Sequence, residues 1–285
     1  MFMHDRETEG QIGMQGRSKV KTSFCISHYQ GDPSELLECI KGYEYTLYNK
    51  SGQSLGEDLD RIAIEIENTG YNLSSYLCYI ITNYSDLPYR VAFVKSDIFP
   101  RHVSKRFFSE LIHSRRDFVP VADYRAWKEI RWPSAFAGHD NMLYEINNSW
   151  YRFKHQRKYF YNYNEFLGYF FGINACSAPV YLRFAPGGNY LVSRERILRH
   201  SKTFYENLLK IISGIPLACE SHYLERSLAM IWDSGVKSIE RPLISSSALR
   251  ELELDCQQKI TKDYQWRHHL KSIALRVNHW IGTGC

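Results

Sequence analysis

The first third of the chain alternates between short apolar runs and longer runs with helical periodicity, and this alternation sets the fold class. In the clearest helical run, apolar residues recur at positions 73, 76, 77, 80 and 81, on one face of a helix. Strands that alternate with helices predict βαβ units, and therefore an α/β fold with a mostly parallel central sheet. The predicted strands are residues 22–27, 43–48 and 90–94, and the predicted helices between them are residues 34–40 and 72–84.

The rest of the chain is less regular, but it contains several predicted helices. We expect them at residues 164–171, 193–200, 249–258 and 268–280, and in the segment that begins with Glu220. A chain of 285 residues with 44% hydrophobic residues can build one large or two small domains. We expect a flexible leader at residues 1–20, one α/β domain at residues 21–240, and a helical extension packed on it at residues 241–285.

Charge and motif content narrow the protein class. The net charge of +5 is consistent with simple solubility or with attraction to phosphate groups. No apolar run approaches the roughly 18 residues of a membrane span, and the N-terminal residues lack the apolar core of a secretory signal. We therefore expect a cytoplasmic protein that can touch the inner face of a membrane.

Known metal and nucleotide motifs are missing from the sequence. The seven cysteines show no CxxC spacing, so neither a structural zinc site nor a disulfide framework is indicated. No GxGxxG follows the first predicted strand, and neither GxxxxGKS nor GxxxxGKT occurs anywhere. These absences argue against Rossmann dehydrogenases and P-loop enzymes.

Polar residues follow the predicted strands at the sheet edge where α/β proteins bind ligands. Asp97 ends the third strand segment and could hold a hard divalent cation that neutralises a diphosphate. The alternative is a turn residue that bonds to its own backbone. The donor-binding candidates at this edge are His28, Tyr29, Asp32, Asn49, Lys95 and Ser96.

A Pro-Gly-Gly turn and a later acidic helix form the second candidate cluster. Gly187 and Gly188 allow a ligand to approach the main chain. Glu220 opens a predicted helix, where a carboxylate stays ionised, and Glu225 lies about 140° further around the helix axis. Both cannot face one ligand squarely, so we expect one of them to act as a base. The alternative is that both are solvated or ion-paired acids.

Aromatic and basic residues supply further candidates. Arg194 begins a basic helix and is either a phosphate clamp or part of a solvated face. Residues 151–162 interleave basic and aromatic side chains, which suits anionic lipid, an oligosaccharide or single-stranded nucleic acid. We expect no nucleic-acid partner, because no RNA-binding or DNA-binding motif is present. The candidate acceptor-binding residues are Trp127, Trp132, Tyr190 and His222.

Three runs of the sequence resemble a known family. NLSSYLCYIITNYSDLPYRVAFVKSDIF, APGGNYLVSRERILRHSKTFYENLL and ESHYLERSLAMIW are similar to segments of a little-characterised glycosyltransferase-like family from bacterial polysaccharide clusters and fungi. The resemblance covers about residues 20–235 and implies a GT-A-type α/β/α sandwich that binds a nucleotide sugar. It places Asp97 at the metal-binding Asp-x-Asp motif, Gly187 and Gly188 near the sugar, and Glu220 or Glu225 near the base. The sequence departs from the motif, because Lys95-Ser96-Asp97 holds only one carboxylate.

The sequence therefore predicts a glycosyltransferase of surface polysaccharide synthesis. It would move a sugar from a nucleotide diphosphate to a hydroxyl of a glycan or a lipid-linked acceptor, with inversion and a Glu base. The expected cofactor is Mn²⁺ or Mg²⁺. The alternative is a noncatalytic module that binds a glycan or a nucleotide in the same cleft.

Overall fold

The computed structural model describes residues 21–123, 130 and 132–282. The predicted leader at residues 1–20 and the predicted acceptor residue Trp127 lie outside the described residues.

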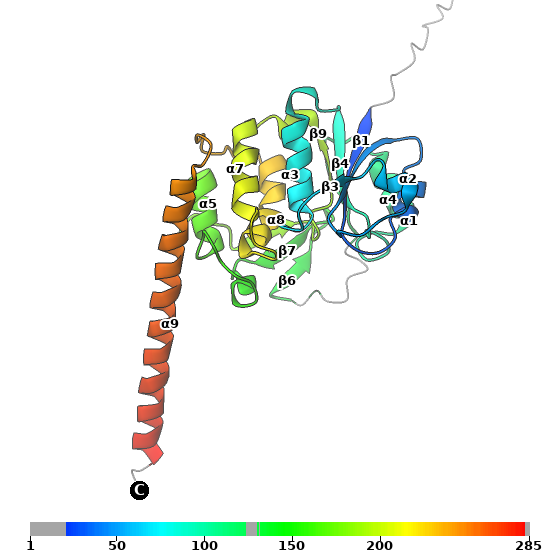
Figure 1. The fold of residues 1–285 in the computed structure, drawn as a ribbon. Helices are drawn as coiled ribbons and strands as arrows, with labels where there is room; N and C mark the ends of the chain where they lie inside the picture. The colour runs from blue at the N-terminus through cyan, green and yellow to red at the C-terminus, as the bar shows by residue number, and fades with distance from the viewer. Residues whose placement is uncertain (1–20, 124–129, 131, 283–285) are drawn as a thin grey trace, which may run out of the picture.

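A six-stranded mixed sheet forms the centre of the molecule (Figure 1), with the strand order β3-β2-β1-β4-β9-β5. Its strands are β1 (Thr22–His28), β2 (Glu44–Asn49), β3 (Ile64–Glu65), β4 (Arg90–Lys95), β5 (Phe118–Pro120) and β9 (Tyr190–Ser193). Strands β3, β2, β1 and β4 are parallel, and β9 is antiparallel to both of its neighbours. The expectation of an α/β fold with a mostly parallel sheet is confirmed.

Helices cover both faces of this sheet, because successive strand residues point to opposite sides. Phe24 and Ile26 of β1 pack in one apolar cluster with residues of α1 (Ser34–Cys39) and α4 (Lys105–Ile112). Cys25, between them, belongs to a second cluster with α3 (Leu73–Thr82), α7 (Lys202–Ile212) and α8 (Cys219–Trp232). Phe93 of β4 stacks on Trp232 of α8 at 5.1 Å between ring centroids. The predicted strands and helices in residues 22–95 match the observed ones to within one or two residues.

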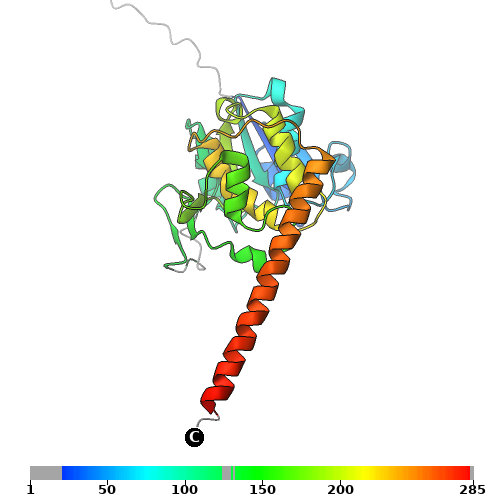
Figure 2. The same cartoon turned by 90° about the vertical axis from the view of Figure 1, so that its left-hand side faces the viewer.

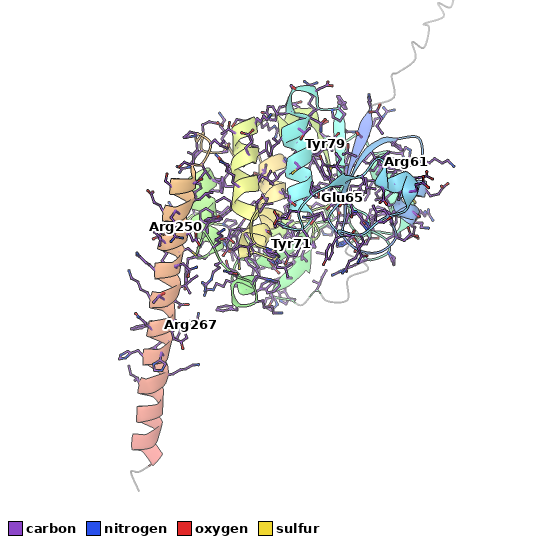
Figure 3. All side chains as sticks on the ribbon, in the orientation of Figure 1. Arg61, Glu65, Tyr71, Tyr79, Arg250 and Arg267 are labelled. Atoms are coloured by element: carbon purple, nitrogen blue, oxygen red, sulfur yellow. The ribbon has the colours of Figure 1, made fainter. Side chains whose placement is uncertain are left out.

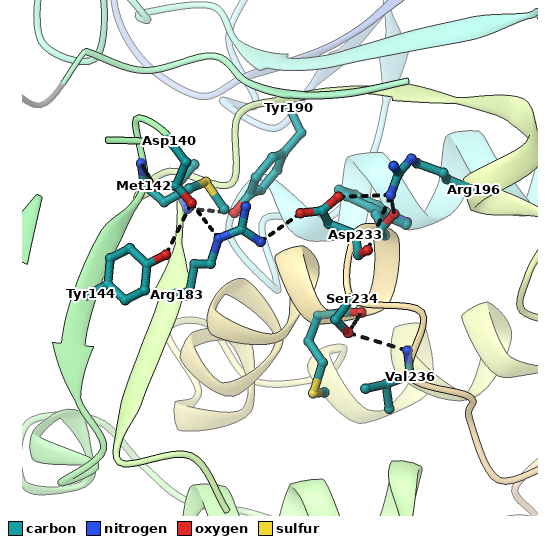
Figure 4. Close-up of polar contacts among 12 residues, drawn as sticks. Asp140, Met142, Tyr144, Arg183, Tyr190, Arg196, Asp233, Ser234 and Val236 are labelled. Carbon is teal, nitrogen blue, oxygen red and sulfur yellow. Dashed lines mark hydrogen bonds and ion pairs between the residues drawn. The ribbon is translucent and has the colours of Figure 1, made fainter. Parts of the chain in front are cut away.

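A small antiparallel sheet, not predicted from the sequence, lies beside the main layers. It consists of β6 (Ala135–Ala137), β7 (Leu143–Ile146) and β8 (Tyr181–Phe184), in that order. Arg183 of β8 pairs at 2.6 Å with Asp140, between β6 and β7, and at 2.8 Å with Asp233 at the end of α8 (Figure 4), so the second pair ties the sheet to the body. Asp233 also pairs with Arg196 of α6 (Arg194–Ile197) at 2.9 Å. The described residues also form α2 (Glu57–Asp60), α5 (Tyr163–Phe171) and 3-10 turns at Tyr84–Asp86 and Trp150–Phe153.

The C-terminal extension is one continuous helix, α9 (Ser246–Gly282), where the sequence predicted two helical segments. Its first part packs on the body through Leu249 and Leu252, and Cys256 is fully buried. Further along, Lys259 pairs with Glu165 of α5 at 3.0 Å. The C-terminal part of α9 projects beyond the body (Figures 1 and 2), and Trp266 is 61% exposed. Figure 3 labels two positions on α9: Arg250 near its start, and Arg267 further along, whose guanidinium lies 5.2 Å from the centre of the Phe153 ring. None of the helices in the described part of the chain is both long and apolar enough to cross a membrane.

Candidate functional site

A cavity of about 600 Å³ opens at the carboxyl ends of β1, β2 and β4. The chain leaves β1 toward β2 on one side and returns to β4 on the other, so the strand order reverses between β1 and β4. Ligands of open α/β sheets bind in the crevice at such a reversal. Because β9 runs antiparallel to β4, the Pro-Gly-Gly turn that precedes it reaches the same edge. The cavity is completed by residues 68–73 at the start of α3 and by the start of α8.

The glycine turn forms one wall of the cavity. Gly187 has a positive φ of 81°, and a Cβ there would lie 2.8 Å from Asn189 Nδ2 and 2.9 Å from His102 Cε1. Its N–H donates to Glu225 Oε1 at 2.6 Å, and its carbonyl accepts from Asn72 Nδ2 at 2.5 Å. Gly188, also at positive φ, lies against Leu73. The turn therefore requires glycine for both conformation and space.

Glu225 of α8 is the carboxylate that faces the cavity from the helical side. Its side chain is 20% exposed, and Oε2 lies 3.2 Å from Arg226 Nη1. Arg226 is held in turn by Glu145, with 2.7 Å between Nε and Oε2. Burial raises the pKa of Glu225, and the Arg226 charge and the Gly187 N–H partly oppose this shift. A carboxylate with a raised pKa that opens onto a cavity is suited to accept a proton.

His222 lies one helical turn from Glu225, and their Nδ1 and Oε2 atoms are 4.0 Å apart. The Tyr71 hydroxyl is 3.2 Å from His222 Nε2. Burial, with the charges of Arg226 and His155, lowers the pKa of His222 to about 3, so the imidazole is neutral near pH 7. The backbone around this group is strained, because Tyr71 and Leu217, which both line the cavity, have positive φ. Such strain is concentrated at functional sites in proteins.

Basic side chains line the strand edge of the cavity. Lys95 Nζ lies 3.2 Å from Asp97 Oδ1, and Arg101 follows a few residues later. Burial and the charges of Lys95 and Arg101 lower the pKa of His102 to about 4. Lys50, directly after β2, is buried, and its ammonium donates to the carbonyls of Thr69 and Tyr71 and, at 2.6 Å, to Ser74 Oγ. Lys50 thus holds the loop that carries Tyr71.

A comparison with protein families matches residues 40–241 to the family described as "Protein of unknown function (DUF3431)". The match covers more than half of the chain. The chain belongs to the DUF3431 family. The three runs that resemble a glycosyltransferase-like family lie within the matched residues, but this family carries no assigned activity. No curated protein and no solved structure matches the DUF3431 chain.

Glu220 of the DUF3431 protein is not placed to act as a base in this cavity. It is fully buried, and its Oε1 accepts the backbone N–H groups of Lys158, Tyr159 and Phe160 at 2.9, 2.7 and 3.1 Å. Burial raises its pKa, and these N–H groups partly oppose the shift. The angular separation of Glu220 from Glu225 on α8 explains the difference, because only the Glu225 side of the helix faces the cavity. Glu220 anchors residues 158–160 to α8.

Of the donor-binding candidates at the strand ends, Tyr29 and Lys95 line the cavity. His28 and Ser96 are buried and bond to each other, with 2.9 Å between Nδ1 and Oγ. Asn49 is fully buried and donates to Gln53 and Glu65. Asp32 is exposed and accepts from Ser34 at the start of α1. The side chains of His28, Ser96, Asn49 and Asp32 thus stabilise loops around the site of the DUF3431 protein and do not line its cavity.

The remaining candidates divide between the core, the surface and the cavity. Tyr190 is fully buried, where its hydroxyl accepts the Ala185 N–H at 2.6 Å, so it belongs to the core. Trp132 is 75% exposed and packs beside Phe136. Arg194 is exposed at the start of α6. Gly188 shapes the turn. Four of these candidates line the cavity: Gly187, Asp97, His222 and Glu225.

Several cavity residues of the DUF3431 protein were not among the predicted site residues. Lys50 and Arg101 follow β2 and β4, so the rule that strand ends carry ligand contacts could have found both. Tyr71, Asn72 and His102 reach the cavity through tertiary packing, and no local pattern in the sequence marks them.

The residues present do not build a divalent-cation site of their own. Within residues 21–123, 130 and 132–282, no group of three or more His, Cys, Asp or Glu side chains could hold a metal ion. Asp97 supplies one carboxylate, and Lys95 already pairs with it. Mg²⁺ and Mn²⁺ take about six oxygen ligands, and the one carboxylate that Asp97 could give them already faces an ammonium. The fit to the predicted metal is therefore poor.

Proposed function

We propose that this DUF3431 protein is a glycosyltransferase that moves a sugar from a nucleotide diphosphate to a hydroxyl of a glycan or a lipid-linked acceptor. One observation carries the proposal. The cavity at the strand-order reversal joins cations from the strand ends, Lys95 and Arg101, to a carboxylate of raised pKa, Glu225. A phosphate-bearing donor needs the first feature, and an acceptor hydroxyl that must lose a proton needs the second.

In the proposed reaction, the acceptor oxygen forms a bond to the anomeric carbon of the donor sugar. The bond between that carbon and the diphosphate oxygen breaks, and the nucleoside diphosphate leaves with the electron pair. Glu225 takes the hydroxyl proton, and the charges of Lys95 and Arg101 stabilise the departing diphosphate. Attack from the side opposite the leaving group inverts the anomeric configuration. No step passes through a metal ion.

The neighbours of Glu225 keep its carboxylate in position. Gly187 N–H and Arg226 hold the two carboxylate oxygens at 2.6 and 3.2 Å. The imidazole of His222 is held by the Tyr71 hydroxyl and lies beside the same carboxylate. Because this imidazole is neutral, it does not form an ion pair with Glu225. Tyr29, which is 49% exposed at the end of β1, offers a ring on which a nucleobase can stack.

The proposed acceptor could be carried by a lipid at an anionic membrane surface. Arg152 lies over the ring of Phe153, and Lys154 over that of Trp150, at 4.7 and 5.2 Å from the ring centroids. Phe153 is 61% exposed. Exposed rings among cations suit a peripheral contact with the cytoplasmic leaflet. In this role the proposed enzyme would act at the cytoplasmic face of the membrane, in surface polysaccharide synthesis.

A screen of nucleotide sugars tests the proposal. At least one of a panel of UDP-, GDP-, ADP- and dTDP-hexoses should raise the melting temperature and be slowly hydrolysed. Glu225→Gln should keep donor binding and lose transfer, whereas the matched control Glu251→Gln, at an exposed position of α9, should keep both. Donor binding without hydrolysis or transfer to any acceptor would instead support the noncatalytic binding module.

A further inference from the structure

We infer that the cavity binds the diphosphate of its donor through Lys95 and Arg101 without a divalent cation. The inference rests on the proposed function, and it concerns how the donor is held. It starts from the predicted Asp97 metal position, which the surrounding side chains do not support.

The two carboxylates that line the cavity are both engaged by cations. Glu225 is held by the Gly187 N–H and by the Arg226 guanidinium. Asp97 has the Lys95 ammonium 3.2 Å from Oδ1, and its own side chain is 45% exposed. A cation bound to a single exposed carboxylate would have to displace that ammonium. The Lys95 ammonium thus occupies the position at Asp97 where a metal-dependent enzyme would hold its metal ion.

The cations at this edge are not equivalent. The three hydrogens of the Lys50 ammonium are matched by the Thr69 and Tyr71 carbonyls and by Ser74 Oγ, so Lys50 serves the loop. Lys95, with a 25% exposed side chain, and Arg101 line the open part of the cavity. A guanidinium can bond two phosphate oxygens at once, and an ammonium adds a point charge.

The positions of Lys95 and Arg101 in the fold support a shared ligand. Lys95 is the last residue of β4, at the strand-order reversal, and its backbone N–H is fixed by the buried Asn189 at 3.0 Å. The charges of both residues act on the same buried imidazole, His102. Two positive charges that converge at the carboxyl end of the central strands can neutralise a leaving diphosphate as a cation would.

Calorimetric titration of UDP, GDP, ADP and dTDP tests the inference, first in EDTA and then with Mg²⁺ or Mn²⁺. At least one diphosphate should bind equally well, within about twofold, in both conditions. Lys95→Met and Arg101→Met should each weaken binding by about tenfold or more, as expected for loss of a charged hydrogen bond. Lys202→Met, at an exposed position of α7, is the matched control and should bind as the wild type does. Asp97→Asn should keep binding. Far-ultraviolet circular dichroism and melting temperature confirm that each variant is folded.

The possible failures are distinguishable. Binding that requires Mg²⁺ or Mn²⁺ and that Asp97→Asn abolishes would overturn the inference, while donor hydrolysis under those conditions would leave the proposed function standing. Binding in EDTA, with neither hydrolysis of the corresponding sugar nucleotide nor transfer to any acceptor, would support the metal-free site and contradict the transferase. Absence of diphosphate binding in both conditions would contradict both.

Discussion

Replacing Glu220 by Ala should destabilise the protein by about 3–5 kcal/mol, without acting on the chemistry of the cavity. The carboxylate oxygen Oε1 accepts three backbone N–H groups at 2.7 to 3.1 Å, and Glu220 itself is fully buried. A hydrogen bond to a charged group contributes about 1.5–3 kcal/mol. Removing the carboxylate also removes the cost of burying its charge, which offsets part of this loss. The N–H groups of Tyr159 and Phe160 then stay buried without a partner, and the net cost matches that of breaking a buried charged network.

Glu220→Gln should cost less, about 1–2 kcal/mol, because an amide oxygen still accepts hydrogen bonds, although more weakly. The assay is urea unfolding followed by circular dichroism, with Glu251→Gln as the exposed control. If Glu220→Ala unfolds within about 0.5 kcal/mol of the wild type, the anchoring role assigned to Glu220 is wrong. If Glu220→Gln is as stable as the wild type but loses transfer, the carboxylate takes part in the chemistry after all.

Two further changes probe the walls of the cavity. Gly187→Ala puts a side chain at a positive φ and close to Asn189 and His102, so it should lower the free energy of unfolding by about 1–3 kcal/mol and weaken donor binding. The control Gly235→Ala has a similar φ but no atom within 4 Å of the new Cβ, so it should destabilise the protein less and leave donor binding intact. In the folded protein the pKa of His102 is about 4 and that of His222 about 3, both below the value in the unfolded chain. As the pH drops below about 6.5, the unfolded chain therefore binds protons that the folded protein does not, and the free energy of unfolding falls. Each histidine should contribute about 2 kcal/mol of this loss by about pH 5. Urea unfolding of His222→Asn should therefore show a correspondingly smaller dependence of stability on pH. An unchanged dependence would contradict a buried neutral imidazole at His222.

The sequence predicted part of the central layers, where the signals are local. Apolar periodicity in residues 22–95 marks β1, β2, β4, α1 and α3. Strands β3 and β5, of two and three residues, were too short to predict, and α4 was also missed. The sheet of β6, β7 and β8 was missed because its strands are only three or four residues long and β8 pairs with a strand far back in the chain. Continuity of α9 was missed because polar residues around Lys259 interrupt the apolar stripe. There Lys259 pairs with Asp255 one turn earlier on α9 and with Glu165 of α5.

The candidate site was predicted in outline and not in detail. Strand ends, glycine turn and the acidic helix do meet in one cavity, since β9 runs antiparallel and returns its turn to the same edge. The choice between Glu220 and Glu225 depends on the rotation of α8 against residues 158–160, which no local pattern records. The same limit applies to Tyr190, whose ring packs into the core instead of reaching the cavity.

The most direct test of the site is a single-turnover assay of donor-sugar hydrolysis, with the nucleotide sugar that gives the largest thermal shift. Removing a general base should lower the rate by about 100- to 10,000-fold. Glu225→Gln should show that loss with donor affinity unchanged, while Glu251→Gln reacts at the wild-type rate. Equal rates for Glu225→Gln and the wild type would contradict the assignment of this cavity as a glycosyl-transfer site with Glu225 as its base.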